Sequence, residues 1–107
     1  MPKAKYNIVY ITAKNKGEAR KIGKALVESK LAACCNIFDN INSIYNWEGK
    51  TRDDKEAVII AKTKERLTPK LIKKVKSMHS YSCPCIVSFP ISSGNKDFLS
   101  WIDKETI

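Results

Sequence analysis

An unbroken apolar run, residues 57–61 (Ala-Val-Ile-Ile-Ala), limits the fold of this chain more than any other feature. The run is too short for a buried helix, and it has the length of a β-strand. Because successive side chains of a strand point to opposite faces of the sheet, such a run places apolar groups on both faces. Segments 6–13 and 86–91 are rich in β-branched residues and also lack a polar-apolar alternation. The sequence therefore predicts a sheet that is apolar on both faces.

Amphipathic helices are predicted to follow three of the strands. From about residue 16 to 30, apolar residues recur at helical spacing behind Asn15 and Glu18, which resemble a capping box. Thr68 is the expected cap of a second helix with a proline in its first turn. Asn95 is suited to cap a short terminal helix.

The remaining extended segment, residues 33–47, is interrupted by Asp39-Asn40, which predicts a bulge because Asn tolerates a positive φ. Gly49 and the polar residues 50–54 are expected to form the next turn. The resulting order is strand, helix, strand, strand, helix, strand and terminal helix. This order is typical of the ferredoxin-like split βαβ fold, an α+β architecture with both main helices on one face of an antiparallel sheet.

One helical layer covers only half of a sheet that is apolar on both faces. At 107 residues, the chain has room for one domain, residues 1–107, and for no second layer beyond the terminal helix. A large apolar patch is rare on the surface of a monomer. We therefore expect a homo-oligomer with its sheets inside and its helices outside.

Charge and cysteine usage indicate the setting of the protein. The chain has 20 Lys and Arg against 11 Asp and Glu, and the basic residues follow the predicted helices. No base-stacking aromatics accompany the lysines, so a solvated outer surface is favoured over a nucleic-acid site. No apolar stretch is long enough for a membrane span, and residues 1–5 run directly into a strand-like segment, so no leader is expected there. The four cysteines are too few for a disulfide framework. These features predict a cytoplasmic protein with reduced thiols.

The thiols and the single histidine, His79, are the candidates for chemistry, because the chain has no nucleophile elbow, P-loop or dinucleotide motif. The adjacent Cys34 and Cys35 point to opposite faces of a strand, so at least one is expected to be buried. Cys83 and Cys85 lie on one side of an extended segment and could share a soft metal ion, although burial is the simpler interpretation. His79 could instead cap the end of the second helix.

Two tryptophans, Trp47 and Trp101, could line a ligand pocket. Each lies in a stretch whose neighbours have a core pattern, so packing in the core is the favoured interpretation.

Short motifs that span nearly the whole chain carry a family resemblance. They are Glu18-Ala19, Leu31-Ala32-Ala33-Cys34 with Asn36, Ser43-Ile44-Tyr45, Trp47-Glu48-Gly49-Lys50, Lys62-Thr63, His79 with Tyr81 and Pro84, Pro90-Ile91, Gly94-Asn95, and Leu99 with Trp101-Ile102. With these residues the sequence resembles the CutA family, the divalent-cation tolerance proteins. The resemblance implies a ferredoxin-like fold, a tight homotrimer similar to the PII signalling proteins, and a role in tolerance of or response to divalent metals, copper especially.

The resemblance further implies a binding protein without catalytic activity, whose clefts lie between subunits. Cys34 is the thiol that the family associates with metal. The cleft residues, carried over position by position, are Tyr45, Trp47, Lys62, His79, Tyr81 and Trp101.

This chain departs from the family pattern around its histidine. The family usually has Pro after the His, then Tyr-Glu, then Pro-Glu-Ile, whereas residues 79–86 here read His-Ser-Tyr-Ser-Cys-Pro-Cys-Ile. The Pro-Gly expected early in the second strand is also replaced, by Asp39-Asn40. Two acidic positions are lost, and thiols at Cys83 and Cys85 favour a softer ion than a carboxylate site would. The expected metal ligands are therefore Cys34, His79, Cys83 and Cys85, with copper as the metal.

Three hypotheses follow from the sequence. The first is a cytoplasmic homotrimer that binds copper, a related metal or a small anionic ligand in clefts between subunits. The second is an RNA- or anion-binding module that uses the lysine-rich helices. The third is an enzyme that uses a cysteine together with His79.

Overall fold

The computed structural model describes residues 5–107, so the expected absence of a leader at residues 1–4 lies outside the described residues. The elements in chain order are β1 (Tyr6–Ala13), α1 (Lys16–Glu28), β2 (Cys34–Trp47), β3 (Lys50–Lys64), the 3₁₀ turn η1 (Glu65–Leu67), α2 (Thr68–Met78), β4 (Ile86–Pro90) and α3 (Lys96–Glu105). Among the described helices, none is both long and apolar enough to cross a membrane.

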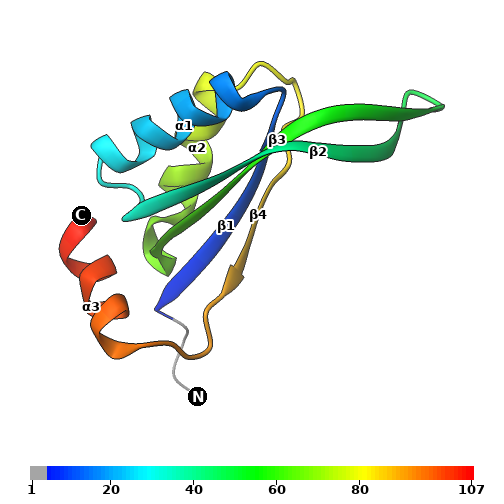
Figure 1. The fold of residues 1–107 in the computed structure, drawn as a ribbon. Coiled ribbons are helices and arrows are strands. Elements are labelled where there is room, and N and C mark those ends of the chain that lie inside the picture. The colour runs from blue at the N-terminus through cyan, green and yellow to red at the C-terminus, as the bar shows by residue number, and fades with distance from the viewer. Residues whose placement is uncertain (1–4) are drawn as a thin grey trace.

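The strands form one antiparallel sheet in the order β2-β3-β1-β4, with α1 and α2 together on one side (Figure 1). This strand order and the single helical layer confirm the predicted ferredoxin-like α+β fold. The ends of β2 and β3 extend beyond the other strands as a projecting hairpin, and α3 lies at the opposite end of the molecule (Figure 1).

The helix-covered face of the sheet holds the core. Val9, Ile11 and Ile59 alternate along β1 and β3 on this face and are fully buried. They pack against fully buried residues of the two helices, namely Ala19, Ile22, Leu26, Leu71 and Val75. The period of two in the strands and of 3.6 in the helices brings these residues into one cluster.

The opposite face of the sheet, which we call the open face, carries the other half of the apolar run. Phe38, Val87 and Phe89 are 52%, 51% and 47% exposed. The strand register pairs Val87 with Tyr10 and Phe89 with Ile8, and it pairs Phe38 with Val58 of β3. The prediction of a sheet that is apolar on both faces is therefore confirmed. The terminal helix α3 buries Ile102 but leaves these residues uncovered.

The start of α2 differs from the prediction that Thr68 caps it. Backbone of helical conformation already begins in η1 and continues through Leu67, so Thr68 lies inside the helix. Its hydroxyl instead accepts a hydrogen bond of 3.0 Å from the amide of Asn7, which ties α2 to β1. Pro69 lies in the first turn, as predicted.

The turn between β2 and β3 is tighter than the sequence indicates. β3 begins at Lys50, and the chain reverses at Glu48 and Gly49 alone, both with positive φ. The prediction that residues 50–54 belong to the turn is therefore wrong. The sequence does not indicate a turn at Glu48, because its conformation usually requires Gly, Asn or Asp. The predicted bulge is confirmed, since the register shifts between Phe38 and Ile41 and Asn40 has a φ of 62°.

Candidate functional site

A cavity of about 660 Å³ opens where the projecting hairpin meets the segment between α2 and β4. Tyr45 and Trp47 line it from the hairpin, and Tyr81, Cys83 and Cys85 line it from the facing segment. We call this cavity the hairpin cleft. It brings together two segments that are far apart in the sequence.

The wall of the cleft nearest the sheet comes from β1. Tyr10 and Thr12 line the cavity from the open face, and Tyr10 pairs with the exposed Val87 of β4. The cleft therefore continues directly into the uncovered apolar surface of the sheet. A partner that covers the open face would also border the cleft.

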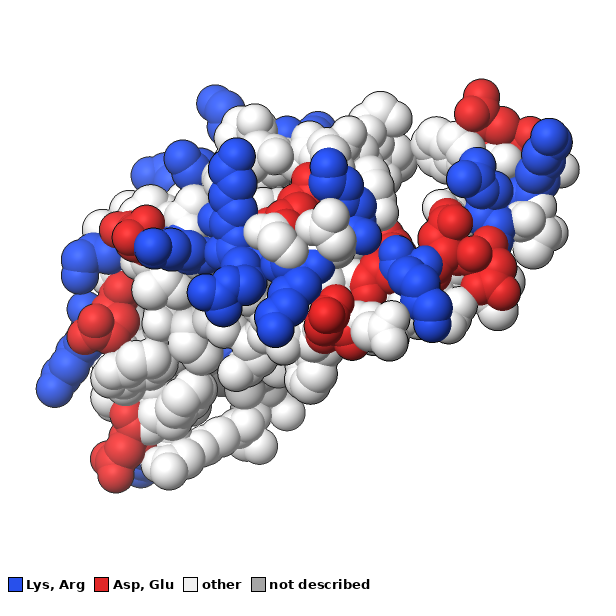
Figure 2. Space-filling model, turned by 45° about the horizontal axis from the view of Figure 1, so that its top comes forward, with Lys and Arg blue, Asp and Glu red and all other residues white. Residues whose placement is uncertain are grey.

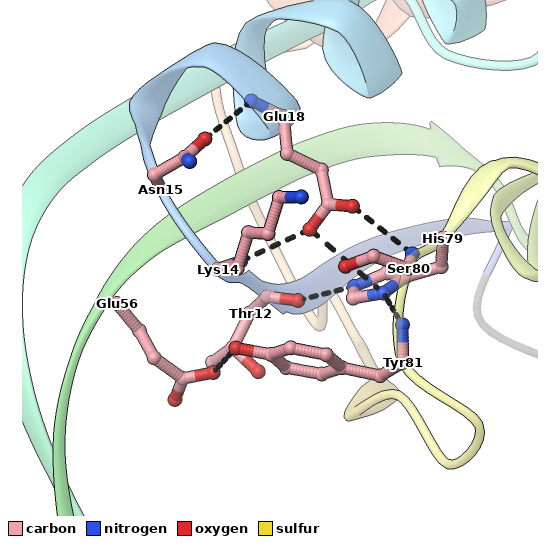
Figure 3. Close-up of polar contacts among 8 residues, drawn as sticks. All are labelled: Thr12, Lys14, Asn15, Glu18, Glu56, His79, Ser80 and Tyr81. Atoms are coloured by element: carbon pink, nitrogen blue, oxygen red, sulfur yellow. Dashed lines mark hydrogen bonds and ion pairs between the residues drawn. The ribbon is translucent and has the colours of Figure 1, made fainter.

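His79 lies behind the cleft wall, and its side chain is fully buried. Its Nε2 lies 2.7 Å from the backbone oxygen of Thr12, to which it donates, and its Nδ1 accepts from the N–H of Tyr81 at 3.1 Å (Figure 3). Both ring nitrogens are thus engaged. His79 is the C-cap residue of α2, but its ring binds β1 rather than the end of the helix.

Glu18 joins α1 to the same segment. The side chain of Asn15 accepts from the Glu18 N–H at 2.9 Å, which confirms the predicted cap. The Glu18 carboxylate accepts from the N–H groups of Lys14 and Ser80, each at 3.0 Å, and lies 4.0 Å from His79 (Figure 3). Desolvation opposes the charged form, but these hydrogen bonds and His79 outweigh it and lower the pKa of Glu18.

Tyr81 connects this network to the hairpin. Its hydroxyl donates to a carboxylate oxygen of Glu56 at 2.7 Å, and Glu56 is only 8% exposed (Figure 3). Burial, followed by this hydrogen bond and the charge of Glu56, raises the pKa of Tyr81. The phenol therefore remains a protonated donor at neutral pH, and it fixes the cleft wall between α2 and β3.

Cys83 and Cys85 are both exposed and unpaired, so the favoured interpretation that they are buried is wrong for the chain by itself. The carbonyl of Cys85 accepts from the N–H of Thr12 at 3.2 Å, which continues the β1–β4 pairing by one residue. Desolvation and then the charge of Glu56 raise the pKa of the Cys85 thiol, although the Thr12 hydroxyl opposes the shift.

Cys34 and Cys35 lie on opposite faces of β2, as expected. Cys35 is partly buried against α1, where a methyl group on Gly23 would lie 3.4 Å from its Cβ. Burial and the neighbouring Cys34 raise the pKa of Cys35 to about 12, which agrees with the prediction of one buried thiol. Cys34 lies opposite Lys62 on the open face, away from the cleft lining.

The other expected cleft residues lie elsewhere on the same chain. The Lys62 ammonium donates to Asn36 on the open face, and Trp101 lies on α3 beside Phe98, with 5.5 Å between ring centroids. Trp47 and Trp101 are 44% and 39% exposed, so the preference for core packing of both is wrong.

The four expected metal ligands do not form one site within the chain. In the described part of the protein, residues 5–107, no three His, Cys, Asp or Glu residues gather closely enough to hold a metal ion. Of the four, only Cys83 and Cys85 line the hairpin cleft. His79 would have to give up the hydrogen bond from Tyr81 or to Thr12 before it could ligate.

Sequence reasoning missed Glu56 as a component of the site. Glu56 directly precedes the apolar run of β3. A carboxylate at such a position is buried only if it has a hydrogen-bonding or charged partner, and this could have indicated its role. Glu18 was read only as a capping residue. Its link to Ser80 joins positions 62 residues apart, and no local pattern predicts such a contact.

Comparison with known proteins assigns the family. Residues 7–105 match the family model described as CutA1 divalent ion tolerance protein. The chain belongs to the CutA1 family. A curated relative from Archaeoglobus fulgidus, named divalent-cation tolerance protein CutA, is 48% identical over 99 residues, which cover 92% of this chain and 96% of the relative. The namesake from Thermus thermophilus is 43% identical with the same coverage.

Solved CutA structures have the same fold. The Archaeoglobus fulgidus protein, described as periplasmic, superposes with a TM-score of 0.91 at 47% identity and covers 94% of this chain and 97% of its own. CutA1 from Oryza sativa gives a TM-score of 0.94 at 38% identity, with coverage of 97% and 95%. Membership of the CutA1 family favours the metal-linked hypothesis over the RNA-binding one.

The network around Glu18 gives a pH-dependent prediction. Because folding lowers the pKa of Glu18 from its ordinary value of 4.5, the carboxylate stabilises the fold above pH 4.5 and loses this effect as pH falls through the folded pKa. Urea unfolding should show that Glu18→Gln lowers the unfolding free energy by about 1–3 kcal/mol at pH 7 and by less with decreasing pH below 4.5.

Glu28→Gln, at an exposed position near the other end of α1, is the control and should change stability by no more than about 0.5 kcal/mol. A Glu18→Gln effect that is the same at pH 3 and pH 7 would contradict the assigned role of the carboxylate.

Proposed function

We propose that the chain is a non-catalytic, copper-responsive binding protein of the cytoplasm that works as a homotrimer of one-domain protomers, residues 1–107. The observation that carries this proposal is the hairpin cleft, which opens onto an uncovered apolar sheet face. The names of the relatives link the family to divalent-cation tolerance. The free thiols are consistent with a reducing compartment.

The open face supports self-association. Phe38, Val87 and Phe89 are each about half exposed on one surface, which is unfavourable in water for a lone protomer. The helical face carries the exposed lysines and arginines of α1 and α2, and Figure 2 shows these cations over the helical side of the molecule. Sheets inside and helices outside would bury the apolar surface and leave the cations in solvent.

A closed ring of protomers explains how the remaining cleft residues contribute. Tyr45, Trp47 and Tyr81 lie at the hairpin cleft, whereas Lys62 and Trp101 lie away from it on the same chain. The hairpin and α3 are at opposite ends of the molecule (Figure 1). In a head-to-tail ring, the hairpin end of one protomer meets another part of the next. We infer that Lys62 and Trp101 of the neighbouring protomer complete the cleft.

The lining of the cleft suits copper or a small anion. Cys83 and Cys85 supply soft sulfur ligands, and Arg52 supplies a cation that could hold an anionic ligand. A thiol-based enzyme is less consistent with the geometry. Both nitrogens of His79 already have partners, and the raised pKa of Cys85 disfavours the thiolate that a nucleophile needs.

Assembly can be tested on the open face. Phe89→Glu places a charge where the proposed interface is apolar, so it should convert the trimer into protomers of 12.1 kDa at micromolar concentration, with an unchanged far-ultraviolet circular dichroism spectrum. Val27→Glu, at a 39% exposed position on α1, should leave the trimer intact. Sedimentation velocity gives both masses, and a Phe89→Glu protein that still sediments as a trimer would contradict the proposed interface.

Completion of the cleft by a neighbour can be tested by fluorescence. In Trp47→Phe, Trp101 is the only tryptophan left, and Cu⁺ added without oxygen should quench its emission in the assembled protein because copper binds beside the neighbour's α3. The same titration of Trp47→Phe/Phe89→Glu protomers should leave Trp101 emission unchanged. Unquenched Trp101 emission in the trimer would rule out the shared cleft.

A further inference from the structure

We propose that Cys83 and Cys85 together bind one monovalent copper ion as a two-coordinate bis-thiolate site, with no third ligand. This inference deepens the proposed function, on which it rests, by naming the ion and the two atoms that hold it. It also removes Cys34 and His79 from the set of ligands that the sequence indicated.

The backbone places both sulfurs at one cavity. The hydrogen bond from Thr12 to the Cys85 carbonyl holds Cys85 in line with β4, so its side chain lies on the open face with those of Val87 and Phe89. Cys83 is two residues earlier, in a bend of the chain, and its side chain lines the same cavity. Pro84 between them fixes one backbone dihedral angle. Both cysteines line the hairpin cleft and are exposed to it.

The number of available ligands selects the ion. Structural zinc takes four ligands, and catalytic zinc takes three from the protein. The described residues 5–107 contain no group of three His, Cys, Asp or Glu that could supply them. The nearest candidates are engaged elsewhere, since Glu56 accepts from Tyr81 and His79 binds Thr12 and Tyr81. Two soft thiolates without further ligands suit Cu⁺, which accepts linear coordination.

The lining of the cleft contains one carboxylate beside the thiols, that of Glu56, which already accepts a hydrogen bond from Tyr81. One carboxylate falls far short of the six to eight oxygen ligands that Ca²⁺ takes. On binding, each thiol releases one proton to solvent and two copper–sulfur bonds form, with no change in oxidation state. The resulting site has a charge of −1, and Arg52 lines the same cleft.

The test is a titration of Cu⁺, held by the chromophoric chelator bicinchoninate, into the reduced, assembled protein without oxygen. The wild type should take one Cu⁺ per chain from the chelator. Cys83→Ser and Cys85→Ser should each weaken Cu⁺ binding by more than about 100-fold. Loss of a residue that only supports a metal ligand already costs up to about 100-fold, and loss of a ligand itself should cost more. Cys34→Ser is the matched control and should bind like the wild type. Copper K-edge absorption of the wild-type complex should report two sulfur neighbours, and excess Zn²⁺ should not displace the ion.

The outcomes separate this inference from the proposed function. Unchanged Cu⁺ affinity in both Cys83→Ser and Cys85→Ser, or weaker binding in Cys34→Ser, would overturn the inference even if Trp101 is quenched in the trimer. A third sulfur or a nitrogen neighbour in the absorption spectrum would overturn two-coordination. Thiol-dependent Cu⁺ binding by a protein whose Trp101 is never quenched would support the thiol pair and contradict the shared cleft.

Discussion

The structure depends on a sheet that is apolar on both faces but has only one helical layer. Burial of Val9, Ile11 and Ile59 beneath α1 and α2 stabilises the protomer, because removing apolar surface from water contributes about 25 cal/mol per Å². The same strands leave Phe38 and Phe89 in solvent on the open face. The burial of apolar strand residues that drives folding of the protomer thus also favours its assembly. The hairpin cleft lies at the edge of the open face.

Polar interactions give this cleft a fixed wall. Glu18, His79 and Tyr81 connect α1, the end of α2 and β1, and Tyr81 continues the network to Glu56 at the base of the hairpin. Buried groups that satisfy one another in this way hold a unique geometry. The role of His79 is therefore structural within the chain, and the thiols of Cys83 and Cys85 remain exposed at the cleft.

The strand and helix order, the bulge at Asp39-Asn40 and the apolar open face could be predicted because hydrophobic periodicity reports them directly. The turn at Glu48 could not be predicted, since a non-glycine residue adopts a positive φ there only within the complete hairpin. Thr68 was misread because η1 continues into α2. Of the expected site residues, Tyr45, Trp47, Tyr81, Cys83 and Cys85 line the cleft. The contact between Glu56 and Tyr81 joins positions 25 residues apart, so no local pattern predicts that these two residues meet.

The central claim, that copies of this chain cover the open face, is tested most directly by hydroxyl-radical footprinting of the wild-type protein at micromolar concentration. The measured quantity is the oxidation rate of Phe38 and Phe89, which are 52% and 47% exposed in the protomer. Our account predicts that both rings are protected in native protein and become reactive only in denaturant. Oxidation of both rings at the rate of half-exposed phenylalanines in the native protein would contradict it.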